Sequence, residues 1–225
     1  MIIIINRRTY FFIIVIKPLT FKICMVFSLC KGGIMNLNQA NEYAKKLFSS
    51  SWVQWVHEGS IPAETSAEKS ENVLKGETSK HCAMCLNLNG CCFVVDKCPP
   101  QPLHPNCHCQ TVNISSIIAQ AQCPIEKFTK YTFVPSLIDD KKQLFELWGY
   151  DIMDSEYLKQ EFERQAKLAY SVGDYELGLL DDFGQRINIK TTLKKKNKNE
   201  YITFSSGWMV YPNGKISLTT PYGRK

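Results

Sequence analysis

The sequence predicts an α+β fold that consists of N-terminal helices, a cysteine-rich zinc knuckle, and two helices packed on a small antiparallel β meander. Three observations support this fold class. Apolar residues recur at helical spacing within residues 36–48 and 139–172, they alternate with polar residues from residue 186 onward, and seven of the ten cysteines lie between Lys80 and Gln110. At 225 residues and 44% hydrophobic content, the chain is long enough to bury one or two modest cores.

Changes in composition divide the chain into four predicted parts, which are an apolar leader (1–34), a helical segment with a polar linker (35–79), a zinc-knuckle loop (80–123) and an α+β module (124–225). In the second part, an asparagine cap and apolar residues at helical spacing predict a helix over residues 36–48. Ser51 can cap a second short helix that stops near Gly59, and we expect its Trp52 and Trp55 to pack in a core. The following stretch is rich in Gly, Ser and Glu, which is typical of a linker.

The apolar leader contains no convincing membrane span or signal peptide. Its longest apolar run, Thr9 to Ile16, is shorter than the roughly 20 residues that a spanning helix needs, and no small-residue cleavage site follows it. Its Ile, Phe, Lys and Asn residues are those that AT-rich DNA encodes, and the Lys-Gly-Gly-Ile before Met35 matches a translated ribosome-binding site. We therefore interpret the leader as untranslated upstream sequence with the true start at Met35. A genuine signal or anchor is the alternative.

The net charge of +6 is concentrated near the N-terminus. Five basic residues and no acidic residue precede Met35, whereas 22 basic residues and 21 acidic residues follow it. The body of the protein is thus nearly neutral. We do not expect it to bind nucleic acid, because non-specific binding depends on neutralising phosphates.

The α+β module begins with two predicted helices. The first starts at Asp139 or Asp140 and stops at Gly149, and the second covers residues 154–172. Three strands with apolar–polar alternation are then predicted, over residues 186–194, 201–211 and 215–220. A Pro-Asn-Gly sequence separates the last two strands and favours a tight hairpin, so the strands form an antiparallel meander.

The cysteine-rich loop admits four interpretations. Disulfides suit short secreted chains, but export is doubtful here and Cys91 and Cys92 are adjacent. A thioredoxin-like Cys-x-x-Cys opens a helix after a strand, whereas the stretch after Cys82-Ala-Met-Cys85 is expected to turn. A catalytic cysteine needs one thiolate beside a base rather than many competing thiols. A metal site fits best.

The metal interpretation rests on the spacing of the thiol and imidazole groups. Two residues separate the first cysteine pair, one residue separates the second, and a histidine precedes the second pair. We predict a structural zinc ion held by four of five candidate ligands, which are Cys82, Cys85, His104, Cys107 and Cys109. The two pairs of cysteines are the favoured set. His81 and His108 are expected to be exposed or to support the ligands, and Cys91, Cys92 and Cys98 have no evident role.

The same residues resemble a known signature. The string "HCAMCLNLNG…F…P…PLHPNCHC" is similar to the C-terminal Cys-rich signature of phage minor head, or head morphogenesis, proteins. The matching residues are Cys82, Cys85, Leu88, Gly90, Phe93, Pro102, Leu103, His104, Pro105, Cys107 and Cys109. The resemblance implies a role in building the phage head. The long helical body that precedes the signature in that family has no counterpart between Met35 and Cys82.

A second resemblance covers the α+β module. It is similar to a small uncharacterised domain found at the ends of phage head proteins and of polymorphic-toxin-like proteins. The matching residues are Lys130, Pro135, Lys142, Phe145, Gly149, Gly184, Arg186, Trp208, Leu218 and Thr219. Some toxin tails of this build are metal-independent RNases, which implies catalytic roles for Lys142, Arg186 and Thr219 or Thr220. No histidine follows residue 108 to serve as the base.

The leading hypothesis is a non-enzymatic, phage-derived minor head protein that contacts phage head or portal proteins. The alternative is a toxin-type RNase whose partner is an immunity protein. With a start at Met35, we expect the chain to be cytoplasmic or virion-associated and its thiols to be reduced. Membrane association is expected only if the leader is genuine.

Overall fold

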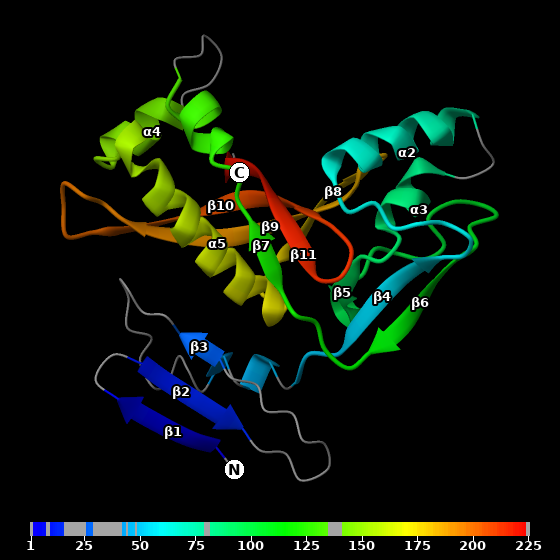
Figure 1. The fold of residues 1–225 in the computed structure, drawn as a ribbon, viewed down its shortest axis with the longest axis horizontal. Coiled ribbons are helices and arrows are strands. Elements are labelled where there is room, and N and C mark those ends of the chain that lie inside the picture. The colour runs from blue at the N-terminus through cyan, green and yellow to red at the C-terminus, as the bar shows by residue number, and fades with distance from the viewer. Residues whose placement is uncertain are drawn as a thin grey trace. The chain divides into compact units, whose positions relative to one another are not determined.

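The computed structural model describes residues 2–7, 10–15, 26–28, 42–43, 45–47, 49–78, 82–134 and 141–223. The chain divides into two compact units, Met1–Lys45 and Lys46–Lys225 (Figure 1). Both helices and antiparallel sheets are present, which confirms the predicted α+β class. None of the helices in these ranges combines the length and apolar character that a membrane crossing requires.

The first unit contains a three-stranded antiparallel sheet in the order β1-β2-β3. Its strands are β1 (Ile2–Arg7), β2 (Tyr10–Val15) and β3 (Val26–Ser28). The β-branched and aromatic residues of the apolar leader favour extended backbone, which agrees with this arrangement. Helical residues within 42–49 confirm the end of the helix predicted over 36–48, whose start lies outside the described residues.

In the second unit, a three-stranded antiparallel sheet has the order β5-β4-β6. Its strands are β4 (Trp52–His57), β5 (Cys92–Val94) and β6 (Cys109–Ile114). The helix predicted from Ser51 to Gly59 is therefore wrong. The burial of β4 alternates, with Val53, Trp55 and His57 buried and the residues between them partly exposed. The sequence hides this alternation because a polar histidine lies on the buried face and an apolar valine on the other. The predicted burial of Trp52 and Trp55 is confirmed.

The predicted linker after Gly59 is also wrong, because it contains the helix α2 (Ser66–Thr78). Thr65 and Glu68 form a capping box: the Glu68 N–H donates to Thr65 Oγ1 at 3.2 Å, and the Thr65 N–H donates to Glu68 Oε2 at 2.9 Å. The face that α2 buries carries Lys69 and Asn72 rather than a run of apolar side chains. Hydrophobic periodicity therefore could not reveal this helix.

The short helix α3 (Ala83–Leu88) follows α2 and packs against it. Cys82 occupies its N-cap position, so the Cys-x-x-Cys sequence opens a helix where a turn was expected. The turn comes later, at Asn89 and Gly90, where Gly90 adopts a positive φ of 80°. A helix, not a strand, is the preceding described element, so the arrangement still differs from the thioredoxin-like one.

The larger sheet of the second unit has five strands in the order β7-β11-β10-β9-β8. Its strands are β7 (Gln120–Gln122), β8 (Glu176–Asp181), β9 (Gly184–Lys194), β10 (Tyr201–Val210) and β11 (Lys215–Gly223). The predicted meander β9-β10-β11 is confirmed, with Asn213 and Gly214 at positive φ in the hairpin. Strand β7, which pairs parallel with β11, and strand β8 extend the sheet beyond the prediction.

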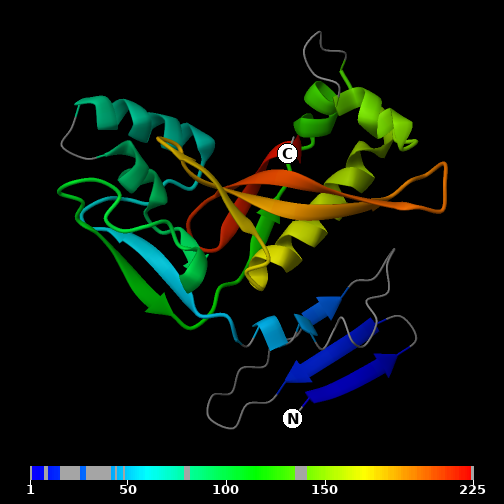
Figure 2. The same cartoon turned by 180° about the vertical axis from the view of Figure 1, so that it is seen from behind.

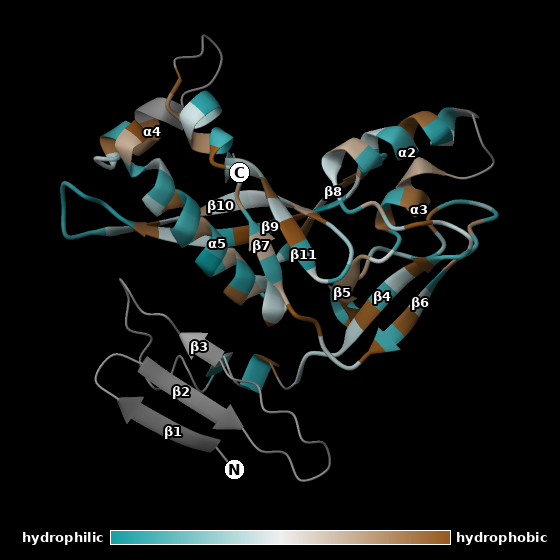
Figure 3. Cartoon of the chain, viewed as in Figure 1, coloured by the Kyte–Doolittle hydropathy of each residue, from teal (hydrophilic) through white to brown (hydrophobic). Residues whose placement is uncertain are grey.

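Helices α4 (Lys141–Leu147) and α5 (Ser155–Ser171) confirm the two predicted helices. Short helical turns, at Val95–Lys97, Lys127–Thr132 and Ile152–Asp154, connect the larger elements. Helix α5 crosses one face of the five-stranded sheet. Figure 2 shows the molecule from behind, with the opposite face of β9 and β10 toward the viewer. Phe162 of α5 packs against Phe204 of β10 with ring centroids 6.0 Å apart. Figure 3 shows polar and apolar residues alternating along α5, as this packing requires.

The core of the second unit is continuous across residue 124. The Tyr170 hydroxyl donates to the Cys92 carbonyl at 2.6 Å, and the Val94 N–H donates to the Tyr175 hydroxyl at 3.0 Å. The cysteine-rich block is thereby fixed to the helices and sheet that follow it. The domain boundary predicted at residue 124 does not separate two cores.

Candidate metal centre

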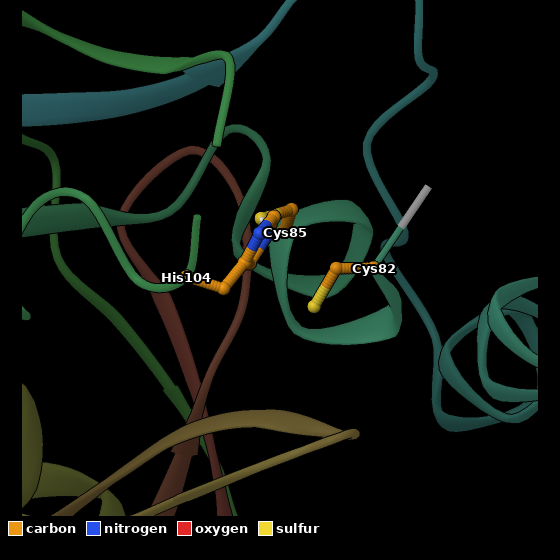
Figure 4. Close-up of side chains that lie close together, drawn as sticks. All are labelled: Cys82, Cys85 and His104. Carbon is orange, nitrogen blue, oxygen red and sulfur yellow. Dashed lines mark hydrogen bonds between the residues drawn. The ribbon is translucent and has the colours of Figure 1, made fainter. Parts of the chain in front are cut away.

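Two segments of the second unit supply the five predicted ligands. Cys82 and Cys85 lie at the N-terminus of α3, whereas His104 and Cys107 lie in the loop before β6, whose first residue is Cys109. In Figure 4 the His104 ring lies beside Cys85, and Cys82 lies on the neighbouring part of the helix. The fold thus brings together residues that are far apart in the sequence, as the spacing predicts.

Cys85 is the centre of this cluster. Its Sγ lies 3.1 Å from His104 Nε2 and 3.8 Å from Cys107 Sγ. Two groups of possible ligand atoms each lie within 4.8 Å of one another: Cys82, Cys85 and His104 form one, and Cys85, Cys107 and Cys109 form the other. All five candidate ligands therefore surround one side chain.

The His104 ring is oriented as a metal ligand would be. Its Nδ1 lies 2.8 Å from the Pro105 carbonyl oxygen, which can only accept a hydrogen bond. Nδ1 therefore carries the proton, and Nε2 presents its lone pair to Cys85. A backbone carbonyl that fixes the tautomer in this way is a common support for metal-binding histidines.

A tight turn places the second group of ligands. The Cys107 N–H donates to the His104 carbonyl at 3.2 Å, and Asn106 adopts a left-handed φ of 62°. Asparagine tolerates this conformation better than most residues, because its side chain can hydrogen-bond locally. The turn allows His104 and Cys107 to approach Cys85 from the same loop.

A hydrogen bond links the thiol groups of Cys85 and Cys109 and shifts both pKa values. A hydrogen bond with Cys109, followed by burial, raises the pKa of Cys85 well above its usual range. The same hydrogen bond from Cys85 is the main cause that lowers the pKa of Cys109 to about 6, against the opposing effect of burial. The shift favours the thiolate form of Cys109, which is the form that ligates a metal.

The geometry suits a metal ion. Zinc binds thiolate sulfur at about 2.3 Å, which places two sulfurs of a tetrahedron about 3.8 Å apart. The Cys85–Cys107 separation of 3.8 Å agrees with that value. Sulfur and imidazole donors also suit soft or borderline metals rather than calcium or magnesium. The cluster can hold a metal ion.

The other cysteines of the loop have packing roles. Cys91 and Cys92 are buried in the core, Cys98 packs against its edge, and all three are free thiols. Burial raises the pKa of Cys91 to about 12 and that of Cys98 to about 11. His108 is exposed, as expected, and His81 lies outside the described residues.

One group beside the ligands could not be found from the sequence. Trp55, in the central strand β4, is fully buried, and its indole N–H lies close enough to Cys109 to lower the pKa of that thiol. No spacing or composition rule links a tryptophan more than fifty positions upstream to a metal ligand. The strand pairing of β4 and β6 creates the contact.

The residues of the alternative catalytic set are distributed over three elements. Lys142 lies in α4, Arg186 in β9 and Thr219 in β11. Strand β10 separates Arg186 from Thr219, a spacing of about 10 Å across two strand intervals. Arg186 forms an ion pair with Asp181 at 2.8 Å. The structure brings these residues onto one module without direct contact between Arg186 and Thr219.

No protein-family model, curated protein or solved structure matches this chain. What is established about the site therefore comes from its own residues: an α+β fold with a cysteine–histidine cluster that can hold a metal ion. The resemblance of its cysteine signature to phage head proteins stays a prediction.

Proposed function

We propose that the chain binds one zinc ion as a structural centre through Cys85, His104, Cys107 and Cys109. The observation that carries this proposal is the convergence of sulfur and imidazole donors on Cys85, at 3.1 and 3.8 Å. The Nδ1 of His104 donates to the Pro105 carbonyl and its Nε2 faces Cys85, so His104 is a better fourth ligand than Cys82, which the spacing alone had favoured. Cys82 remains close enough to replace one ligand when that ligand is lost.

A structural role follows from the ligand count. Four protein ligands fill the tetrahedral shell of zinc and leave no position for a reacting water. The loop around His104 is largely exposed and contributes little apolar surface to the core. Metal binding, worth roughly 10–16 kcal/mol in small zinc modules, would hold this loop against α3.

The test of the zinc centre is the metal content of chain purified without chelators. About one zinc per chain is expected, as four ligands form a single tetrahedral site. Replacing His104 by Ala should weaken zinc binding more than replacing Cys82 by Ser. A folded protein that carries no metal and takes up none on titration contradicts the proposal.

The proposed cellular role is protein–protein contact in or near phage head assembly. It rests on the signature between Cys82 and Cys109, whose cysteines and His104 are the residues that gather around Cys85. In this role the chain works in the cytoplasm or in the virion. Recovery of a portal or head protein with the tagged chain from phage-producing cells supports it. Failure to recover either one with zinc-loaded chain contradicts it.

A second candidate function, a toxin-type RNase, has one favourable observation. Thr219 and Thr220 lie opposite Gly207 at an irregularity in the β10–β11 pairing, and Thr219 Oγ1 would lie 3.2 Å from a side chain added at Gly207. Hydroxyl groups are thus presented on the strand pair next to the one that carries Arg186. Phosphate groups could contact such a surface.

Induced expression of the full chain tests the RNase. Loss of growth and cleavage of cellular RNA are expected, with both effects removed by Arg186→Ala. The matched control is Arg164→Ala, since Arg164 is paired with Glu161 on the exposed face of α5. Intact RNA and normal growth on expression of the wild type exclude this candidate, and rescue by an immunity protein would support it.

A further inference from the structure

Trp55 carries a polar atom that the described residues leave without a hydrogen-bond partner. Its side chain is 0% exposed, and its indole Nε1–H has no well-aligned acceptor. The equivalent atom of Trp208, which is equally buried, donates to Ser206 Oγ at 2.9 Å. Buried N–H groups almost always have a partner, so the unsatisfied donor of Trp55 requires an explanation.

The position of Trp55 is fixed by its strand. Its backbone N–H donates to the Cys91 carbonyl, and its carbonyl accepts from the Gly90 N–H, both at 2.8 Å. On the other side, β4 pairs with β6 so that Trp55 lies opposite Thr111 and His57 lies opposite Cys109. Alternate residues of a strand share a face, so Trp55 is the diagonal neighbour of Cys109.

Cys109 lies on the same face of the β4–β6 pair as the unpartnered Trp55 N–H, within the diagonal reach of an aromatic side chain. His57, the other polar side chain on this face of β4, uses its Nδ1 for Ser60. A neutral thiol is a weak acceptor, whereas a metal-bound thiolate carries charge and accepts a strong hydrogen bond.

We propose that Trp55 is a positioning residue of the metal centre, whose indole N–H donates to the Cys109 thiolate once a metal ion is bound. This inference rests on the proposed zinc centre and on Cys109 as one of its ligands. It explains why a donor inside the core has no partner among the side chains: its partner is the metal-bound sulfur. It also links the central strand of the small sheet to the ligand loop.

Cobalt(II) substitution of the full chain tests this role, because the thiolate-to-cobalt absorption band reports on the ligand sulfurs. Trp55→Phe removes the donor and keeps an aromatic ring. It should leave one cobalt ion per chain, move the band to lower energy, and weaken metal binding about tenfold, as is typical when a supporting hydrogen bond is lost. Trp52→Phe is the matched control, since Trp52 is buried in the same strand but packs on Tyr170.

The outcomes are distinct. An unchanged band and affinity in Trp55→Phe overturn the proposal, as does full metal binding by Cys109→Ser. Wild type that binds no metal overturns the zinc centre itself, together with this inference. If Trp55→Phe does not fold, the wild type loaded with cadmium-113 decides. A scalar coupling between the assigned Trp55 indole proton and the metal is expected, and its absence contradicts the hydrogen bond.

Discussion

The five-stranded sheet of the second unit and the loop that leads into β6 differ in the contacts that surround them. The five-stranded sheet packs against α4 and α5 through buried aromatic rings, among them Phe145, Phe162 and Phe204. The loop that leads into β6 has few buried apolar side chains, and its His104 and Cys107 lie beside Cys85. Burial of apolar surface stabilises the first region, and under the proposed zinc centre metal binding stabilises the second. This contrast predicts that different substitutions destabilise the two regions.

The largest effect is expected for Cys85→Ser. Because Cys85 belongs to both groups of ligand atoms, its loss should abolish stoichiometric zinc binding and increase amide hydrogen exchange in residues 101–109. Exchange in β9 and β10 should change little. Metal analysis and exchange mass spectrometry measure the two parts, with Cys98→Ser as the control, since Cys98 lies outside the cluster. An equal loss of protection from hydrogen exchange in residues 101–109 and in β9 and β10 would contradict this contrast.

The next effect concerns the aromatic core. Phe162 is 0% exposed and contacts Phe128 and Phe204, with ring centroids 5.4 and 6.0 Å away. Phe162→Ala should lower the free energy of unfolding by about 3–5 kcal/mol, because it removes buried surface and leaves a cavity. Urea denaturation measures the change. The folded fraction should still bind about one zinc per chain, and a loss of zinc from folded Phe162→Ala would show that the two regions are not separable.

A third prediction concerns a residue that joins the two regions. Lys69 of α2 is 1% exposed, and its ammonium group donates to the Asn87 carbonyl of α3 at 2.6 Å and to the Phe183 carbonyl beside β9 at 3.0 Å. It also lies 5.0 Å from the centre of the Tyr211 ring. Lys69→Met should lower the free energy of unfolding by about 2–4 kcal/mol, since a buried and a partly buried carbonyl lose their donor.

Lys75→Met is the control for Lys69→Met, because it makes the same change of side chain on the same helix at a position outside the core. Urea denaturation of both variants provides the measurement. Equal stability of the two variants would mean that the buried ammonium contributes nothing to the link between α2, α3 and β9. Lys69→Met should also weaken zinc binding slightly, because α3 carries Cys85.

The sequence was informative wherever one local rule controlled the structure. Helical periodicity located α4 and α5, the Asn-Gly pair located the β10–β11 hairpin, and the Cys-x-x-Cys spacing predicted residues that gather in one cluster. It failed where tertiary contacts decide. Strand β4 buries the polar His57, and α2 buries Lys69 and Asn72, so neither shows the hydrophobic pattern of its own secondary structure. The contact between Trp55 and Cys109 exists only through the pairing of distant strands.

The smallest effect is a pH dependence in the apolar region, away from the metal ligands. Burial is the main cause that raises the pKa of Cys123 from 9.0 to about 12, and the nearby Glu163 carboxylate adds to it. A group whose pKa is higher in the folded state stabilises the protein fully below its unfolded pKa. That contribution is lost as the pH rises from about 9 toward 12, because the unfolded chain ionises more easily.

Removing this thiol should therefore make the free energy of unfolding depend less on pH above about pH 8. Between pH 8 and pH 11 the free energy of unfolding of Cys123→Ala should fall by about 2–3 kcal/mol less than that of the wild type, as measured by urea denaturation. The difference between the two proteins isolates Cys123 from Lys69, whose burial lowers its pKa and acts in the opposite direction as the pH rises. The same dependence on pH in both proteins would show that Cys123 does not ionise on unfolding. A matching change in zinc affinity would show that the apolar region and the metal centre are coupled more tightly than their separate chemistry implies.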